Sequence, residues 1–306
     1  MNKTQEKLKE ITDRLETGVS ELFESERYKE YLTTLSKLHS YSATNTLLIY
    51  LQKPDAQMVA GMTTWNQLHR YINKGEHGIC ILAPCPYKKY VDAAVLDENG
   101  NPKLDSDGKE ILEKKKVVVD YYKPVYVYDI SQTNGKPIET LQPVVLADSV
   151  SDYEKIMSAL TEIAPCPVTF EKIESGANGY FSPGENRIAI KEGMSEALTV
   201  RCLIHEIGHS ILHNLDADAS GKARQTKEVE AESVSFCVAQ FLNIPTEEYS
   251  FPYIAGWSMG KKTEVLKQSL DTVRNCANQL INQLSEKMNL NLNLTESETK
   301  KQTRHI

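Results

Sequence analysis

Apolar residues in the first 54 positions recur at steps of three and four, which is the period of an amphipathic helix. The clearest such face consists of Leu8, Ile11, Leu15, Val19 and Leu22. A second helical run extends from Ser25 to Gln52, and Pro54 ends it because proline cannot continue a helix. A short third helix is predicted from Thr64 to Ile72.

The pattern then changes to one that is typical of strands. Residues 74–89 contain an apolar run that glycines flank and prolines close, which predicts a strand. Residues 92–113 are polar and contain two glycine turns, so they predict a hairpin excursion. Residues 114–133 return to β-forming residues, and residues 134–144 read as a linker.

The second half predicts strands among helices. A helix is expected from Ser151 to Ile163, and strands are expected in residues 167–173 and 179–190, the latter as a pair around a Pro-Gly turn. Further helices are predicted at Ser195–Leu215, Lys227–Leu242 and Lys261–Met288. We therefore expect an α+β protein with one domain in residues 1–140, a second in residues 145–288 and a polar tail in residues 289–306.

Length and charge restrict the classes of protein. The 306 residues suffice for about two domains. The net charge of −7 argues against a generally basic nucleic-acid-binding protein. Residues 1–140 carry 19 Lys and Arg against 20 Asp and Glu, whereas the remainder carries 16 against 22. A polyanion should therefore bind to a local patch in the first half.

Segments for export or membrane insertion are not evident. The first ten residues, MNKTQEKLKE, are charged and lack the apolar region of a signal peptide. No window approaches the roughly 18 unbroken apolar residues of a membrane span. The six cysteines are scattered without a Cys-x-x-Cys pair. We expect a reduced, cytoplasmic protein without a membrane partner.

Residues 203–213, LIHEIGHSILH, contain the pattern His-Glu-x-x-His. On a helix, His205 and His209 lie one turn apart on one face, so both imidazoles can reach one ion at roughly 2 Å, as zinc needs. Glu206 is offset by one residue and can act on water at the metal without taking a metal position. The pattern predicts a Zn²⁺ site, but a motif this short is not decisive alone, and the site requires a third ligand from elsewhere in the chain.

Two acidic residues on the next predicted helix are candidates for that ligand. Glu228 and Glu232 are four residues apart and share a face. One glutamate would complete a gluzincin-like site with two histidines, and the other would hold a ligand histidine's free N–H. We assign Glu228 as ligand and Glu232 as support; the reverse stays open. His213 lies roughly 12 Å along the axis from His205, so we assign it to support or packing.

The stretch from about Pro167 to Phe241 resembles the minimal zincin domain of the ImmA/IrrE-type metallopeptidases. The resemblance rests on GYFSPGENRIAI, on HEIGHSILH and on Glu-x-x-Ala-Glu at 228–232, which departs from that family's usual Ala-Asn in its last step. The departure matches a second family, the ArdC-type antirestriction proteins. These join an N-terminal single-stranded-DNA-binding domain to such a metallopeptidase domain.

The first half resembles that N-terminal domain. The matching stretches are NTLLIYLQKP (45–54), GMTTWNQLHRYINKGEHGICILAPCPYKK (61–89) and VYVYDISQT (125–133). The resemblance implies that residues 1–140 bind single-stranded DNA and that residues 145–288 form the zincin-like domain. It also implies an antirestriction or transfer role on a mobile element.

Aromatic and basic residues interleave between Gly61 and Lys89, where four Lys and Arg stand against one Glu. Aromatic faces beside cations suit single strands, because base stacking tolerates any sequence. We expect the DNA-binding residues to be Trp65, Arg70, Lys74, Tyr87, Lys88 and Lys89. Core packing is an equal alternative for Trp65.

The chemistry expected at the metal is hydrolysis of a peptide bond. Glu206 would take a proton from water as it attacks a carbonyl, and would later protonate the leaving amine. The oxyanion needs a donor, for which Tyr180 and His213 are candidates. An exposed edge of the strand at 187–191 could bind an extended peptide of unknown sequence by β-addition.

Two functions from different classes follow. One is a zinc metalloendopeptidase that acts on one or a few proteins. The other is a binding protein that coats single-stranded DNA and blocks restriction, with the zinc site secondary. The alternative to the ArdC-type function is an ImmA/IrrE-like regulatory endopeptidase that cleaves a repressor, with DNA binding weak or absent.

Overall fold

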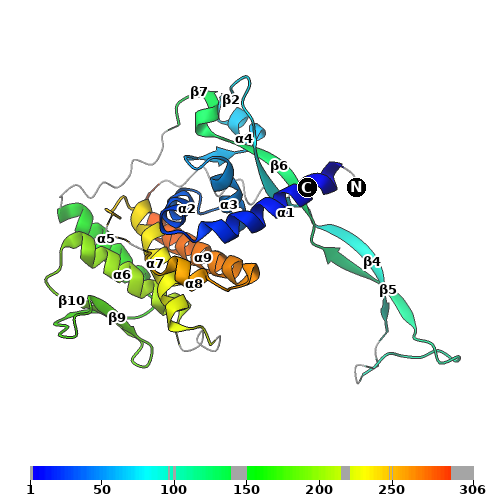
Figure 1. The fold of residues 1–306 in the computed structure, drawn as a ribbon. Helices are drawn as coiled ribbons and strands as arrows, with labels where there is room; N and C mark the ends of the chain where they lie inside the picture. The colour runs from blue at the N-terminus through cyan, green and yellow to red at the C-terminus, as the bar shows by residue number, and fades with distance from the viewer. Residues whose placement is uncertain are drawn as a thin grey trace.

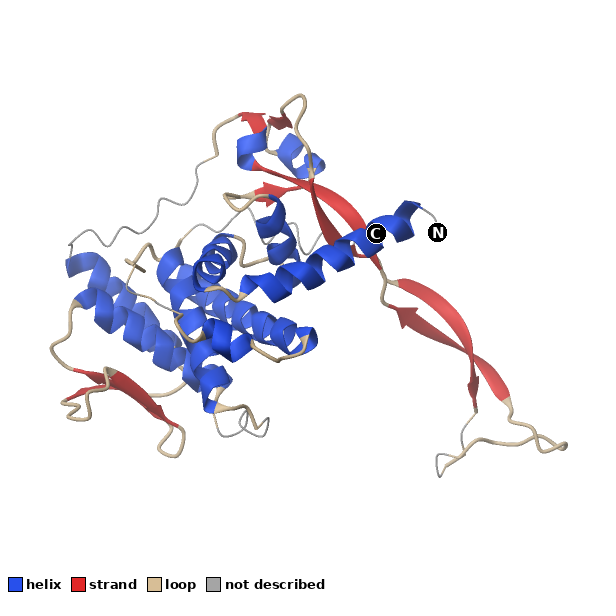
Figure 2. Cartoon of the chain, viewed as in Figure 1, coloured by secondary structure: helices blue, strands red, loops and turns tan. Residues whose placement is uncertain are grey.

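Helices from both ends of the chain pack side by side in the computed structural model, and strands extend from their sides (Figures 1 and 2). The expected α+β class is confirmed. Within the described part of the chain, no helix combines the length and apolarity that crossing a bilayer requires. The structure describes residues 3–95, 97–98, 101–138, 150–214, 221–247, 249 and 251–290.

The N-terminal helices follow the predicted apolar face. They are α1 (Lys3–Leu22), α2 (Ser25–Lys37) and α3 (Ala43–Gln52). Four of the five apolar residues of the predicted face in α1 are buried, and Leu8 is half-buried. The predicted single run after α1 is divided, because the Ser42 side chain accepts a hydrogen bond from the Asn45 N–H and so caps a new helix.

A small antiparallel region follows. Its elements are β1 (Val59–Ala60), α4 (Met62–Gln67), β2 (Arg70–Ile72), β3 (Ile79–Pro84), β6 (Tyr122–Asp129), the 3-10 turn η1 (Ile130–Gln132) and β7 (Thr133–Gly135). Strands β1, β6 and β3 form one sheet in that order, and β2 pairs with β7. The helix predicted to reach Ile72 ends at Gln67, because His69 adopts a φ of 56° and the chain continues as β2.

The predicted polar hairpin is an antiparallel ribbon of two strands, β4 (Tyr87–Ala94) and β5 (Leu112–Val119). It projects away from the helices (Figure 1). Neither strand pairs with any other strand among the described residues. Its two outer edges are therefore unpaired within the described chain, and most of its side chains are exposed.

The second half begins with α5 (Val150–Ile163) and a sheet of β8 (Val168–Glu171), β9 (Gly179–Ser182) and β10 (Arg187–Lys191). Strand β10 lies in the middle, parallel to β8 and antiparallel to β9. The expectation of an exposed edge at 187–191 is therefore wrong, because both edges of β10 are paired. Strand β9 forms the edge of the sheet that lies next to the following helix, residues 196–212.

Four helices complete the described chain: α6 (Glu196–Leu212), α7 (Arg224–Phe241), α8 (Ile254–Ser258) and α9 (Thr263–Lys287). The Ser195 side chain caps α6 by accepting a hydrogen bond from the Leu198 N–H. Helix α8 was not predicted. Residues 139–144 of the predicted linker and 291–306 of the predicted tail lie outside the described residues.

One hydrophobic core joins the two halves. The Tyr28 hydroxyl of α2 lies 2.9 Å from the Ser233 hydroxyl of α7, and both residues are buried. Arg274 of α9 donates to the backbone oxygens of Ser40 and Tyr41. The division at residues 140–145 stays a prediction, but the helices on its two sides share their apolar faces.

We expect Leu32→Ala to lower the free energy of unfolding by about 2–5 kcal/mol, because Leu32 is fully buried in this shared core. Trp65 and Trp257 report on the two halves, so unfolding can be followed by fluorescence in variants that keep one tryptophan each. Both reporters should shift together. Leu104→Ala is the control, since Leu104 is 59% exposed on the hairpin. Two transitions, of which only one shifts, would contradict a common core.

Candidate metal centre

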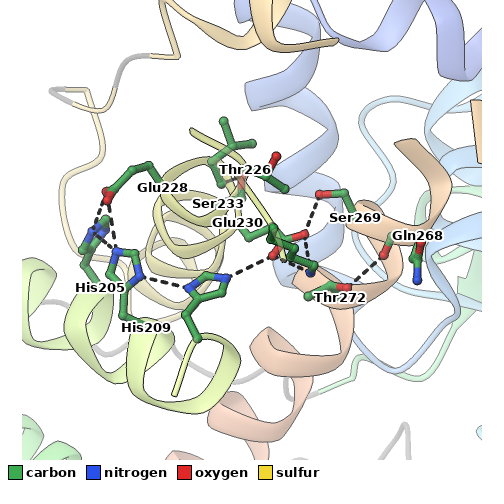
Figure 3. Close-up of polar contacts among 12 residues, drawn as sticks. His205, His209, Thr226, Glu228, Glu230, Ser233, Gln268, Ser269 and Thr272 are labelled. Carbon is green, nitrogen blue, oxygen red and sulfur yellow. Dashed lines mark hydrogen bonds and ion pairs between the residues drawn. The ribbon is translucent and has the colours of Figure 1, made fainter. Parts of the chain in front are cut away.

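Helices α6 and α7 pack against each other and bring three side chains to one point (Figure 3). His205 Nε2 lies 3.1 Å from His209 Nε2, and Glu228 Oε2 lies 3.6 Å and 3.5 Å from these two atoms. A tetrahedral zinc with ligands at about 2.0–2.1 Å spaces its ligand atoms about 3.3–3.4 Å apart. The triangle of ligand atoms therefore fits a divalent ion of this size.

Glu232 lies one turn after Glu228 and contacts the second ring nitrogen of His205. Its Oε2 is 3.1 Å from His205 Nδ1. A ligand histidine whose second nitrogen is held by a carboxylate has a fixed ring orientation. The structure thus places Glu228 and Glu232 as the sequence-based assignment requires, and that assignment stays a prediction until metal binding is measured.

The electrostatics of these residues favour a cation. Hydrogen bonds from His205 and His209 hold the pKa of Glu228 well below its usual range. Burial alone would lower the pKa of His205, but the carboxylates of Glu228 and Glu232 outweigh it and raise the pKa to about 10. The carboxylates that hold an imidazolium here would equally hold a divalent cation.

Glu206 lies on the inner side of α6 and is 7% exposed. Burial raises its pKa, and the Phe181 N–H of β9 donates to its carboxylate. A cavity of about 350 Å³ is lined by Glu206, His205 and Glu232, with Gly179 of β9 at its edge. A Cβ at Gly179 would lie 2.7 Å from Cys202 Sγ, so glycine permits this close approach of β9 to α6.

The two candidates for the oxyanion donor are engaged elsewhere. The Tyr180 hydroxyl donates to Glu171 and accepts from Arg187, and Tyr180 is absent from the described lining of the cavity. His213 lies 3.0 Å from His209 through Nδ1 and 3.1 Å from Glu230 through Nε2. The expectation for Tyr180 is therefore corrected, and the contacts of His213 are those that its predicted supporting role requires.

Glu230 is a functional candidate that the sequence did not single out. It lies on α7 between Glu228 and Glu232 but is only 1% exposed. Burial would raise its pKa, yet hydrogen bonds from His213 and Lys222 outweigh this effect and lower it. An acidic residue on the apolar side of a helix indicates a functional role, but Glu230 lies between two other glutamates and so does not stand out in the sequence.

Two of the expected DNA-binding residues are structural. Trp65 is fully buried, and its Nε1–H donates to the Tyr128 backbone oxygen. The Arg70 guanidinium donates to the Thr133 hydroxyl and to backbone oxygens of Thr133 and Lys136. These contacts pack α4 on the sheet and tie β2 to β7. The expectation for Trp65 is wrong, because its buried ring cannot stack on a base, and the three hydrogen bonds of the half-buried Arg70 give that guanidinium a structural role.

The other expected residues are exposed. Lys74 follows β2, whereas Tyr87, Lys88 and Lys89 lie on β4 in the projecting ribbon (Figure 1). Pairing places Tyr90 opposite Lys116. Because side chains alternate along a strand, Lys88, Tyr90, Lys114 and Lys116 share one face of the ribbon. The sequence could not show this face, since the register across the long turn was unknown.

Comparisons with known proteins agree with this architecture. Residues 1–128 match the family model of the N-terminal domain of the anti-restriction factor ArdC. An uncharacterized protein of Bacillus anthracis, pXO2-81, is 27% identical over 314 residues, covering 92% of this chain and 52% of that protein. The chain thus spans about half the length of this curated relative.

A solved structure shows the same fold. The metal-free crystal structure of the antirestriction ArdC protein from the R388 plasmid matches with a TM-score of 0.50 and 18% identity, over 81% of this chain and 85% of that one. The Mn(II)-bound structure of that protein matches with a TM-score of 0.49 and 16% identity over the same shares. Residues 1–128 thus carry an ArdC-type N-terminal domain, and the chain shares its overall fold with the R388 ArdC protein.

Proposed function

We propose that this protein is an ArdC-type antirestriction factor whose second half hydrolyses peptide bonds at a Zn²⁺ centre. The observation that carries the proposal is the triangle of His205, His209 and Glu228 beside the buried Glu206. A divalent metal fits this donor set, and imidazole with carboxylate suits zinc. The bound metal would supply a Lewis acid for a peptide carbonyl.

Glu206 is the residue that we expect to move protons. Its carboxylate lines the cavity next to His205, and it is not one of the three ligands. It can take a proton from water and later return one to the leaving amine. The Phe181 N–H fixes the carboxylate at the edge of β9.

The outer edge of β9, which no other described strand covers, supports a peptide substrate, although its Phe181 N–H donates to Glu206. The Ile188 N–H of β10 donates to Pro167, so the backbone of Ile188 faces β8. Phe181 is opposite Ile188 in the register, and its backbone groups therefore point away from β10. An extended peptide that adds to this edge would lie beside Glu206.

Metal content and cleavage test this proposal on the full chain. Elemental analysis of purified protein should find one zinc per chain. A proteome-derived peptide library, incubated with the metal-loaded protein and read by mass spectrometry, should show new peptide ends. A chain that neither contains nor takes up Zn²⁺ would overturn the metal centre. A metal-loaded chain that cleaves no peptide would overturn the peptidase alone.

A second function, binding of single-stranded DNA, is favoured by the projecting ribbon. Tyr87 and Tyr90 are 49% and 61% exposed, and exposed lysines lie beside them. Exposed rings next to cations are the surface that single strands use. We place this interface on the ribbon rather than at Trp65 and Arg70, with Lys74 as a separate candidate contact.

We expect Tyr90→Ala to weaken binding of a short single-stranded oligonucleotide by roughly 1–3 kcal/mol at any salt concentration, because one stacked base is lost. Lys88→Ala should reduce the slope of log affinity against log salt by about 0.7, as one phosphate contact disappears. Fluorescence anisotropy with the full chain measures both. Tyr253→Ala and Lys262→Ala are matched controls, since both residues are exposed in the other half.

The preference for single strands decides this second function. The near-balanced charge of residues 1–140 predicts modest affinity at physiological salt. At low salt, single strands should bind more tightly than duplexes of the same length. Equal affinity for both would count against the DNA interface and leave the peptidase proposal untouched.

A further inference from the structure

A row of buried polar contacts leads from the metal centre into the protein (Figure 3). It runs from His209 to His213 and from His213 to Glu230, with separations of 3.0 Å and 3.1 Å. Lys222 Nζ lies 2.9 Å from both carboxylate oxygens of Glu230, and the Ser269 hydroxyl of α9 donates to one of them at 3.0 Å. The side chains of His213 and Glu230 are 4% and 1% exposed.

Metal binding by His209 would determine which nitrogen of each histidine in this row carries the proton. If His209 offers Nε2 to a metal, its Nδ1 must carry the proton and donate to His213 Nδ1. His213 then carries its own proton on Nε2, which donates to Glu230. The carboxylate accepts at this point and has no proton to give, so it is the end that sets the direction.

If the hydrogen bonds ran in the opposite direction, a proton on His209 Nε2 would prevent that atom from binding a metal. A group that donated to His213 Nε2 would place the His213 proton on Nδ1, facing His209. His209 would then carry its proton on Nε2, the atom that faces His205 and Glu228. An acceptor at the position of Glu230 prevents this arrangement.

From these contacts we propose that Glu230 and Lys222 are positioning residues for the metal centre, acting through His213 to fix the tautomer and ring orientation of His209. The inference rests on the proposed function, since it assumes that His209 is a ligand. It gives His209 the support that Glu232 gives His205 directly. Lys222 and the Ser269 hydroxyl of α9 both donate to this carboxylate and fix its position.

A contribution to stability does not by itself explain the ion pair between Lys222 and the buried Glu230. Well-packed apolar residues in place of such a pair are often neutral or stabilising. Removal of one partner, in contrast, leaves an unpaired buried charge and destabilises the protein. A test must therefore separate loss of charge balance from loss of the acceptor.

The test compares Glu230→Leu with the double variant Glu230→Leu/Lys222→Met in the full chain, because leucine, unlike glutamine, offers His213 no acceptor. The single variant leaves Lys222 unpaired and should both unfold at a lower temperature and bind Zn²⁺ or Co²⁺ more weakly. The double variant restores charge balance, so its unfolding temperature without metal should recover. Its metal affinity should nevertheless stay about 10–100-fold below that of the wild type, as for other lost partners of ligand histidines.

Glu196→Gln is the control, because it removes the same charge from an exposed position in the first turn of α6. Nitrogen NMR of the zinc-loaded wild type should show His213 protonated at Nε2 alone, and the double variant should lose this single form. A double variant with wild-type affinity would overturn the role of Glu230 while the metal centre stands. A wild-type chain that binds no metal would overturn the centre and this role together.

Discussion

Glu206→Gln should leave the fold and the bound metal intact and lower peptide hydrolysis by about 10²–10⁴-fold. Glutamine has the same shape, and its amide oxygen can still accept from the Phe181 N–H that now holds Glu206. It cannot take a proton from water at neutral pH. Because Glu206 is not one of the three clustered ligands, the variant should retain one metal ion per chain.

Three measurements on one preparation check this result. They are metal content, thermal unfolding and peptide cleavage read by mass spectrometry. The matched control is again Glu196→Gln on the same helix, which should cleave like the wild type. Cleavage by the Glu206 variant at the wild-type rate would remove this residue from the mechanism. Loss of metal together with cleavage would instead point to a role in metal binding.

Glu228→Ala should abolish the stabilisation of the chain by added Zn²⁺. A metal that binds the folded state stabilises it by about 4.1 kcal/mol at a thousand times its Kd. Removal of a direct ligand should cost more than the roughly 10–100-fold in affinity that is lost with a hydrogen-bond partner of a ligand. Glu232→Ala should show only that smaller loss, because Glu232 contacts His205 Nδ1.

Thermal unfolding with and without Zn²⁺, together with elemental analysis after gel filtration, compares the two variants directly. The expected order of retained metal is wild type, then Glu232→Ala, then Glu228→Ala. The opposite order of the two variants would make Glu232 the ligand. Equal retention in all three chains would show that neither carboxylate binds the metal.

The sequence was most informative where chemistry follows local geometry. His205 and His209 are one helical turn apart, as are Glu228 and Glu232, so each pair shares a face whatever the rest of the fold does. Glu230 lies two residues after Glu228 and so points to the far side of α7. That it meets Ser269 there depends on how α9 packs, and its contact with Lys222 depends on the path of the chain before α7; no local pattern reveals either.

The errors also have physical causes. Trp65 lies in a segment rich in aromatic and basic residues, but composition does not distinguish a packed indole from an exposed one. Arg70 is used to close the β2–β7 pair, which joins residues more than sixty positions apart. The edge at 187–191 was misplaced because strand order in the sheet does not follow chain order.

The packing of α2 and α3 against α7 and α9 has a consequence for synthesis on the ribosome. The apolar faces of the first helices are complete when residue 52 has been made, but α9 ends only at Lys287. At roughly 5–20 residues per second, those faces wait on the order of 10–50 s for their partners. We therefore expect the nascent chain to need protection from aggregation until α9 has been made.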